Sequence, residues 1–468
     1  MNAITTTEAT EPVTTTDIPW DRLRGTVAGR LHLPGDPDFA AVSTPWVVNV
    51  PQRPAAVLEV ADTGDVVAAV RFAEEHGVAV TAQPRGHAAR TTLDDTLLLR
   101  TRALDSIDVD IQRGTARVGA GVKWGELMAR LDGTGLVALC GSNPDPSVVG
   151  LTLGGGVSWF TRKYGFTANS VVSFEVVGPC GDLVTVTRAS DPDLFWALRG
   201  GGGDFGIVVS IELALMLAPS VHGGKLMWAV EHAATVLKAF RDLALTAPDE
   251  LTVWGHVYHF PPLPDLPEPI RGRSFVGVAF THLGSAAEAE ALIKPLRDAA
   301  PVQLDLVGPV PPSAMGEVAQ EPTEPMPSLE FGTLLTGVDD AAIDRIVAVV
   351  GDRERCPLIV TQLRGLGGGF ARTSPAAGAV AAVQEPFQLF AVGVPAVPEL
   401  EAPIRAAFGA LAGAVDGLAT GHAMPNFTPD GSPNSVCYPP ETLERLRRIK
   451  LERDPRGTIR SNKPVLGE

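Results

Sequence analysis

One histidine lies in a short, turn-rich segment that suits nucleophilic chemistry. His87 ends the run Gln83-Pro-Arg-Gly-His87, which separates an expected strand at 78–81 from another at 96–99. An imidazole is neutral near pH 7 and nucleophilic, so it can add to an electrophilic carbon. A hydrogen-bonded turn histidine is the alternative for this segment.

Two glycine-rich segments follow His87. The first is Gly150-Leu-Thr-Leu-Gly-Gly-Gly156, and the second is Arg199-Gly-Gly-Gly-Gly-Asp-Phe-Gly206. Consecutive glycines admit positive φ, so their backbone N–H groups can converge on an anion such as a pyrophosphate. Neither segment is a P-loop or a GxGxxG that opens a helix, which disfavours both of those sites. Tight turns without a ligand are the alternative for either segment alone.

Titratable side chains gather on one expected strand, at 252–260. Because side chains alternate along a strand, Trp254, His256 and Tyr258 share one face and His259 lies on the other. A second expected strand, at 358–364, carries Gln362 and Arg364. Ordinary sheet residues are the alternative for all of them, because a general base needs hydrogen-bond reach of its substrate.

The elements that must position these residues divide the chain into two halves. Up to residue 213, short strands alternate with short helices, which indicates an α+β or α/β domain. The helices are expected at 20–30, 63–76, 123–131 and 191–198, and the strands at 78–81, 96–99, 115–118, 171–177, 183–187 and 207–213. The strands 171–177 and 183–187 are predicted to form a β-hairpin.

The second half has longer elements, and we expect an antiparallel sheet backed by helices. The strands are expected at 252–260, 274–281, 358–364 and 387–392, and the helices at 233–243, 285–299 and 340–350. The Pro-rich span 308–327 is a candidate loop or lid. A charged helix is expected at 439–450.

Composition bounds the partners of the protein. The chain has 468 residues, 45% of them hydrophobic, and a formal net charge of −16. This length suits two or three domains, and the acidic balance argues against nucleic acid and anionic membranes. The four cysteines show neither CxxC nor metal-ligand spacing, so we expect buried free thiols and no metal site. Residues 1–19 read as a flexible tail rather than a signal peptide, which favours a cytoplasmic protein.

The glycine-rich motifs resemble those of a known family. Residues 54–213 are similar to the FAD-binding domain of the berberine bridge enzyme-like group, within the vanillyl-alcohol oxidase superfamily. Residues 150–165, GLTLGGGVSWFTRKYG, resemble the family's GLxLGGGxGxLxRxYG, and residues 193–206, DLFWALRGGGGDFG, resemble DLFWALRGGGGNFG. The segment ending at His87 lies where members have a GGH or TGH segment. The resemblance implies an α+β fold, with a PCMH-type FAD-binding domain of two subdomains and a substrate domain.

The resemblance also implies a cofactor and its site. In the family, the histidine of this segment bonds the 8α-methyl carbon of FAD, which assigns covalent attachment to His87. The implied domains are a tail at 1–19, an FAD-binding domain at 20–218, a substrate domain at 219–410 and a segment at 411–468 that returns to the FAD domain. The cofactor-binding residues are expected to be Pro84, Arg85, Gly86, His87, Ala88, Gly141, Ser142, Ser147, Gly150, Gly154, Tyr164, Gly206, Ile207 and Asn426.

Several positions depart from the family pattern. Asn143 stands where many members carry a cysteine that forms a second bond to the flavin, and Cys140 lies three residues earlier. We therefore predict a single covalent bond. The tyrosines that act in sugar-oxidising members are replaced by Val157 and Met424, which puts a carbohydrate substrate in doubt. Pro146 lies near the position that controls oxygen access in the family, and leaves oxidase or dehydrogenase behaviour open.

The function that follows is oxidation of a small organic molecule, with a secondary-metabolite alcohol or amine favoured. The resemblance implies hydride transfer to flavin N5, with O2 as acceptor, and a sheet that roofs the flavin. The candidates for accepting a substrate proton are His256, Tyr258 and His422, while Gln362 and Arg364 would bind a carbonyl or carboxylate. The aliphatic composition suggests a mostly apolar pocket. A flavin-dependent cyclase, oxidative or redox-neutral, and a non-catalytic binding protein are the alternatives.

Overall fold

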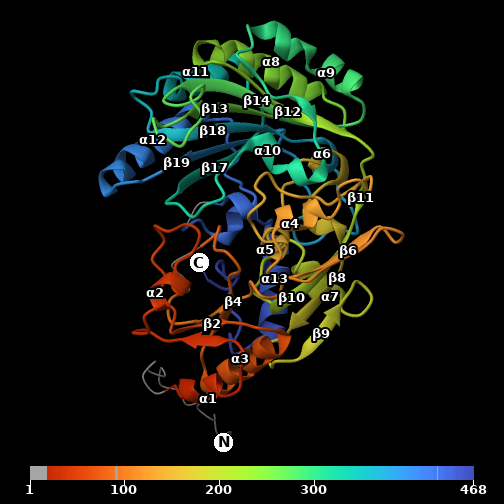
Figure 1. Ribbon diagram of the computed structural model, residues 1–468, viewed down its shortest axis with the longest axis vertical. Helices are drawn as coiled ribbons and strands as arrows, with labels where there is room; N and C mark the ends of the chain where they lie inside the picture. Colours follow the sequence, from red (N-terminus) through yellow and green to blue (C-terminus); the bar gives the residue numbers. More distant parts are fainter. Residues whose placement is uncertain (1–17, 90–92, 429–430, 468) are drawn as a thin grey trace, which may run out of the picture.

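Three main sheets organise the protein, which is described here by a computed structural model (Figure 1). The structure describes residues 18–89, 93–428 and 431–467, so most of the expected tail at 1–19 lies outside the described residues. The first sheet has the strand order β1-β2-β4-β3. Its strands are β1 (Arg30–His32), β2 (Ala56–Glu59), β3 (Val80–Ala82) and β4 (Leu97–Arg100).

Helix α3 (Thr63–His76) connects β2 to β3 and has the predicted bounds. Val66 and Val70, four residues apart, lie on its buried face. The helix ends at Gly77, whose φ of 68° is the left-handed conformation that glycine adopts without a Cβ penalty. Strands β2 and β3 both pair in parallel with β4, so the chain leaves the carboxyl ends of β2 and β3 at the same edge of the sheet.

The second sheet has the order β5-β6-β10-β8-β9. Its strands are β5 (Ile107–Asp110), β6 (Thr115–Gly119), β8 (Val171–Val177), β9 (Leu183–Val186) and β10 (Ile207–Ala214). The predicted hairpin is confirmed, because β8 and β9 pair antiparallel. Helices α4 (Trp124–Ala129), α5 (Val148–Leu153), α6 (Thr161–Tyr164) and α7 (Pro192–Ala197) lie between the strands in sequence.

The third sheet is antiparallel, with helices on one face. Its central order is β12-β14-β13-β18-β19-β17. These strands are β12 (Val221–Ala229), β13 (Leu251–His259), β14 (Ser274–Leu283), β17 (Leu329–Leu335), β18 (Leu358–Gly365) and β19 (Phe387–Gly393). Figure 1 shows α8 (Ala233–Thr246), α9 (Ala286–Ala299) and α11 (Asp340–Val350) on the outer side of this sheet. The α+β fold expected from the sequence is confirmed.

The other face of the third sheet packs on the first half of the chain. The hydroxyl of Thr281 donates to the carbonyl oxygen of Trp159 at 2.9 Å. The rings of Trp254 and Trp159 stack with centroids 3.9 Å apart. On the opposite face, a Cβ on Gly255 would lie 2.9 Å from the side chain of Leu237 in α8. The alternation predicted for 252–260 therefore places Trp254 and its partners toward the first half of the chain.

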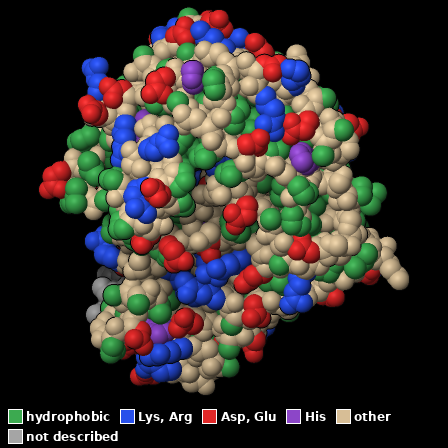
Figure 2. All heavy atoms as spheres, turned by 45° about the horizontal axis from the view of Figure 1, so that its top comes forward, with side chains coloured by type: hydrophobic (Ala, Val, Ile, Leu, Met, Phe, Trp, Pro, Cys, Tyr) green, Lys and Arg blue, Asp and Glu red, His purple; other side chains and the backbone are tan. Residues whose placement is uncertain are grey.

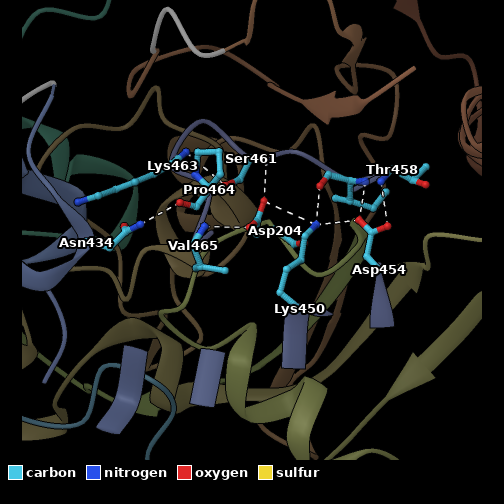
Figure 3. A network of polar contacts seen from close by, with 10 residues as sticks. Asp204, Asn434, Lys450, Asp454, Thr458, Ser461, Lys463, Pro464 and Val465 are labelled. Carbon is cyan, nitrogen blue, oxygen red and sulfur yellow. Dashed lines mark hydrogen bonds and ion pairs between the residues drawn. The ribbon is translucent and has the colours of Figure 1, made fainter. Parts of the chain in front are cut away.

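The C-terminal segment returns to the first half. Helix α13 (Pro440–Arg453) packs against α7, where Arg445 donates to Asp193 at 2.8 Å. Figure 3 shows Lys450 between Asp204 and Asp454, where its Nζ bonds an Asp454 oxygen at 2.7 Å. Beyond the helix, the amide of Arg460 donates to the carbonyl of Val80 in β3 at 2.8 Å.

The structure also shows how surface charge is distributed and how deeply the cysteines are buried. Figure 2 shows acidic and basic side chains interspersed over one face of the molecule. Among the described residues, no helix combines the length and the hydropathy that crossing a membrane requires. All four cysteines are free, but the expectation that all are buried holds only for Cys140 and Cys356, because Cys437 is half-buried and Cys180 is exposed in the turn between β8 and β9.

Candidate active site

The loop between β3 and β4 carries His87 and is held by a close backbone contact. Gly86 has a φ of 91°, and a Cβ there would lie 2.6 Å from the side chain of Pro45. Glycine is therefore required at this position by both conformation and space. The carbonyls of Arg85 and Gly86 accept hydrogen bonds from the amides of Trp46 and Val47 at 3.0 and 3.4 Å.

Two side chains orient the imidazole of His87. Its Nε2 lies 2.9 Å from a carboxylate oxygen of Asp145, and its ring stacks on Trp46 with centroids 4.3 Å apart. The His87 side chain keeps 21% of its surface exposed. Because Asp145 accepts the proton of Nε2, the neutral tautomer carries its lone pair on Nδ1.

Asp145 is fixed as a carboxylate by two donors. Its second oxygen lies 2.6 Å from Nζ of Lys123. Burial alone would raise the pKa of Asp145, but the hydrogen bonds from His87 and Lys123 lower it to about 2. The group therefore stays ionised at any physiological pH and keeps accepting the His87 proton.

The segment 141–150 runs beside this pair and holds the predicted cofactor residues Gly141, Ser142, Ser147 and Gly150. Ser147 caps α5 by accepting the amide of Gly150 at 3.0 Å. A Cβ on Gly141 would lie 2.9 Å from Leu151. The segment is also tied to α4, since Trp124 donates its amide to the carbonyl of Pro146.

Asn143 has a structural role at the position where a second flavin bond was considered. Its side chain accepts the amide of Asp145 at 2.9 Å and donates to the carbonyl of Pro322 at 2.8 Å. Cys140 is buried, and burial raises the pKa of its thiol to about 12. Because the thiolate is the nucleophile, Cys140 is unreactive in this environment.

The first glycine-rich segment meets Asn426. The Asn426 side chain accepts the amide of Gly156 at 2.8 Å and donates to the carbonyl of Leu151 at 3.2 Å. A Cβ on Gly154 would lie 2.5 Å from the same side chain. The structure thus brings together two of the predicted cofactor positions, Gly154 and Asn426, from segments far apart in sequence.

Close packing accounts for glycine at two positions of the second segment, Gly200 and Gly206. A Cβ on Gly200 would lie 2.7 Å from Val380, and one on Gly206 would lie 2.4 Å from Val176. Tyr438 donates its hydroxyl to the carbonyl of Gly200 at 2.8 Å. These steric contacts explain the glycines without a bound anion. The second segment therefore gives no support to the expectation that both segments bind a pyrophosphate.

Two further predicted cofactor residues lie in contacts of other kinds. Ile207 begins β10 and pairs with Val177 of β8. The hydroxyl of Tyr164 donates to the carbonyl of Leu217 at 3.2 Å. Neither residue contacts the His87 loop in the part of the chain that the structure describes.

The inner face of the third sheet carries a row of polar and aromatic side chains. The strand register aligns Lys225, Ala279, Trp254, Arg364 and Gln388 across five strands. A second row contains Met227, Gly277, His256, Gln362 and Phe390. The composition suggested a mostly apolar pocket. This face instead carries charged and polar side chains beside the apolar ones.

His256 is buried and unpaired on this face. Its side chain stacks on Tyr258 with centroids 5.0 Å apart, and both ring nitrogens lack a hydrogen-bond partner among the described residues. Burial, with the nearby charges of Lys225 and Arg364, holds the pKa of His256 well below its usual value. Burial also raises the pKa of Tyr258. At neutral pH the imidazole is therefore uncharged, and the phenol keeps its proton.

Arg364 is enclosed by aromatic rings. Its Nε and Nη2 donate to the side-chain oxygen of Gln362 at 2.8 and 2.6 Å. Its guanidinium carbon lies 4.3 Å from the ring centroid of Trp254 and 4.4 Å from that of Phe427. Burial lowers the pKa of Arg364 to about 10, so it remains a cation at neutral pH.

Two polar residues of this face were not among the predicted site residues. Lys225 lies on β12, a strand that the sequence did not indicate, and its side chain is buried. Gln388 lies on β19, and its side-chain oxygen is buried without a partner among the described residues. The sequence offered no signal for Lys225, because its register position is revealed only by the pairing of β12 with β14.

His422 does not join this group. Its side chain is 64% exposed and pairs with Glu385 at 3.2 Å. Val157 and Met424, at the positions of the family tyrosines, are buried apolar residues. Among the predicted bases, the structure therefore brings together His256 and Tyr258 and leaves His422 apart.

The Pro-rich span is bound to the His87 region. Helix α10 (Gly316–Ala319) interrupts the span, and the indole N–H of Trp46 donates to the carbonyl of Thr323 at 3.2 Å. The amide of Met326 donates to the carbonyl of Trp46 at 3.1 Å. The span therefore braces the ring that stacks on His87.

Polar atoms near His87 fit a bound dinucleotide. Nε2 of Gln83 and Nε of Arg85 are buried without a hydrogen-bond partner among the described residues. Both are donors, and phosphate or flavin oxygens are acceptors that suit them. The residues present are thus compatible with FAD beside the His87 loop.

Comparison with known proteins relates this chain to flavoenzymes. The family described as FAD binding domain matches residues 54–187. The (R)-6-hydroxynicotine oxidase of Paenarthrobacter nicotinovorans is 28% identical over 93% of this chain and 96% of its own length. The FAD-linked oxidoreductase dpmaF of Metarhizium anisopliae is 33% identical, and the match spans 44% of its length. The solved structure of Physcomitrella patens BBE-like 1 has the same fold, with a TM-score of 0.83 at 19% identity over 97% of this chain and 99% of that one.

Proposed function

We propose that the chain is an FAD-linked oxidoreductase of the berberine bridge enzyme-like group, which binds FAD through one covalent bond at His87 and oxidises a small organic molecule. The observation that carries the attachment is the His87–Asp145 pair at 2.9 Å. Asp145 holds the Nε2 proton, so Nδ1 presents its lone pair for addition to the flavin methyl carbon. Asn143 is occupied by structural hydrogen bonds, which supports a single bond.

The residues that would hold the dinucleotide lie along two segments. The loop with Pro84, Arg85, Gly86, His87 and Ala88 offers a cation and buried donors. Gly141, Ser142, Ser147 and Gly150 lie on the segment that carries Asp145. We assign the phosphates to these two segments, with Gly154 and Asn426 nearer the ring system. When bound, FAD supplies the electron sink that accepts a hydride from a substrate C–H at N5.

His256 is the residue best placed to accept a substrate proton. It is neutral, faces the first half of the chain and has two ring nitrogens without partners among the described residues. Proton removal from a substrate O–H or N–H favours loss of hydride from the adjacent carbon. Tyr258 stacks on the imidazole and fixes its plane. Gln362 and Arg364 orient the polar end of the substrate.

The substrate is proposed to be a small alcohol or amine, with O2 as the electron acceptor. A relative that aligns over nearly its whole length is an oxidase named for hydroxynicotine. Val157 and Met424, in place of the family tyrosines, argue against a sugar substrate. A secondary metabolite remains the favoured class.

Acid precipitation of the purified protein tests the attachment. We expect yellow colour to stay with the precipitated chain and the intact mass to exceed that of the polypeptide by one FAD. The variant His87→Ala should release all its flavin into the acid supernatant. His232→Ala, a matched change on the third-sheet side of the chain, should keep the flavin bound. Acid-stable flavin in His87→Ala would contradict the proposal.

Reduction of the bound flavin tests the reaction. Under anaerobic conditions, an oxidisable alcohol or amine should bleach the flavin absorbance, and admitting O2 should restore it with release of hydrogen peroxide. His256→Gln should slow the bleaching by about 100-fold or more, because general-base catalysis typically contributes that much. A wild-type rate in His256→Gln would remove His256 from the proposed role.

A further inference from the structure

Lys225 is a buried cation on the inner face of the third sheet. Its side chain is 2% exposed and donates one hydrogen bond, to the carbonyl of Ala319 at 2.8 Å. Its Nζ lies 4.8 Å from the ring centroid of Tyr258. An ammonium group has three donors, so two of them have no acceptor in the part of the chain that the structure describes.

The other buried lysine shows how this fold satisfies such a charge. Lys450 is 3% exposed, and its Nζ bonds a carboxylate oxygen of Asp454 and the carbonyls of Asp204 and Ile459. Buried charges are normally paired in this way, because an unpaired charge in a protein interior is costly. Within the described residues, Lys225 forms no ion pair, although the chain has an excess of acidic residues. Among the described residues, no carboxylate lies in ion-pair contact with Lys225, and Glu321 acts on its charge only from a longer distance.

Arg364 approaches from the opposite side of the same face. Lys225 is on β12 and Arg364 on β18, and both charges reach β13, where His256 lies between Trp254 and Tyr258. Among the described residues, Arg364 forms no ion pair, and its Nη1 donates no hydrogen bond. Gly277 and Ala279 of β14 fill the positions between Lys225 and β13, so little side-chain volume separates the two.

We propose that Lys225 and Arg364 form an anion-binding subsite over His256, which selects substrates that carry an acidic oxygen as a carboxylate, phenolate or enolate. This inference rests on the proposed function, because it assigns the substrate class of the same site. The ring nitrogens of His256 are buried without partners among the described residues, so the N–H of the neutral ring can donate to the anion while the other nitrogen stays an acceptor. A bound anion would satisfy the two cations, and His256 would remain free to accept a proton.

Calorimetric titration of the holoenzyme with charged and neutral analogue pairs tests the subsite. Benzoate should bind more tightly than benzamide, or 4-nitrophenolate more tightly than 4-nitroanisole, depending on which acidic oxygen the site takes. Lys225→Met should weaken the preferred anion by about tenfold to a hundredfold, as expected for a lost charge-assisted hydrogen bond, and leave the neutral analogue unchanged. Lys294→Met, a matched loss of an exposed lysine, should leave both affinities unchanged.

The pH dependence of benzoate binding provides a second measurement. Burial lowers the pKa of Lys225 to about 8, while benzoate keeps its charge throughout. The groups facing Lys225 are His256 and Tyr258 of β13, Arg364 of β18, and Glu321 after α10. The neutral imidazole and the protonated phenol do not titrate between about pH 6 and about pH 9. The affinity should fall as the pH rises through about 8, and Lys225→Met should remove that fall.

The outcomes separate this inference from the proposed function. A protein without flavin would overturn the proposed function before any analogue is added. A yellow holoenzyme that binds neutral analogues as tightly as anions, or whose anion affinity is unaffected by Lys225→Met, would overturn the subsite alone. If Lys225→Met fails to fold, Lys225→Arg keeps the charge and should preserve the preference for the anion. Equal affinities for both analogues in a folded Lys225→Arg protein would count against the subsite.

Discussion

Asp145 both hydrogen-bonds His87 and fixes the orientation and tautomer of its imidazole. The carboxylate bonds Nε2 and Lys123, and Trp46 fixes the ring plane, so only one nitrogen keeps a lone pair for reaction. A nucleophile whose base and orientation are supplied by neighbours reacts faster than the same side chain in water. Asp145 is in this sense a positioning residue for the attachment step.

Replacing Asp145 with asparagine tests this role. The amide cannot hold the Nε2 proton as a carboxylate does, so both tautomers of His87 become populated. We expect Asp145→Asn to bind FAD but to attach it more slowly, by about tenfold or more. The measurement is acid-stable flavin against time after FAD is added to freshly expressed apoprotein. Asp94→Asn, which removes the half-buried carboxylate that pairs with the exposed Arg53, is the matched control. Wild-type attachment kinetics in Asp145→Asn would contradict the role.

Sequence reasoning identified part of this site. The alternation along 252–260 placed His256 and Tyr258 together, because a strand has a fixed period of two. Asp145 escaped notice because its contact with His87 joins residues 58 positions apart, and no local pattern encodes it. Lys225 was not predicted as a site residue for the same reason, because its place beside His256 depends on the register of β12 against β14. His422 was a candidate only by its position near Asn426 in sequence.

At the scale of elements, local periodicity predicted those helices and strands whose bounds tertiary packing did not change. Helices 63–76 and 340–350 have the expected bounds because each has an apolar face and a clear start or stop signal. Strand β12 was not predicted, and it contains Gly223 and Gly224, a residue type that is depleted in strands. A Cβ on Gly223 would lie 2.4 Å from a carbonyl of β14, so close strand approach explains the glycine. The strand order of the third sheet could not be predicted from the sequence either, because it depends on pairing between strands far apart in the chain.

The second glycine-rich segment packs closely against neighbouring elements. Gly200 has a φ of 100°, and a Cβ there would lie 2.7 Å from Val380. We expect Gly200→Ala to lower the free energy of unfolding by about 1–3 kcal/mol, because it adds backbone strain and a steric clash. Thermal denaturation followed by circular dichroism measures the change.

Gly409 provides the matched control for Gly200. It lies exposed inside α12 (Glu401–Ala414), and a Cβ there would meet nothing within 4 Å. Gly409→Ala should therefore raise the free energy of unfolding by about 0.5–1 kcal/mol, through better helix propensity and a less flexible unfolded chain. Opposite signs for the two variants support the packing account, and an unaffected Gly200→Ala protein would contradict it.

At the scale of the whole molecule, the C-terminal segment connects α13 to the loop that carries His87. Asp204 accepts the amides of Ser461 and Val465, and Lys450 joins it to Asp454 (Figure 3). Beyond this network, the side chain of Asn462 donates to the carbonyl of Ala88, next to His87. A buried charge network near the end of the chain therefore positions a contact on the proposed attachment loop.

Lys450→Met should disturb both stability and flavin attachment. The substitution leaves two buried carboxylates without their cation, which typically costs about 3–5 kcal/mol. We expect a lower melting temperature and, at temperatures where the protein is still folded, less acid-stable flavin, because the segment that contacts Ala88 is less firmly held. Lys450→Met/Asp454→Asn removes one of the stranded charges and should recover part of the loss, as coupled neighbours do. Lys294→Met controls for the loss of a lysine. If the double variant is no more stable than Lys450→Met, the charge network is not what holds this segment.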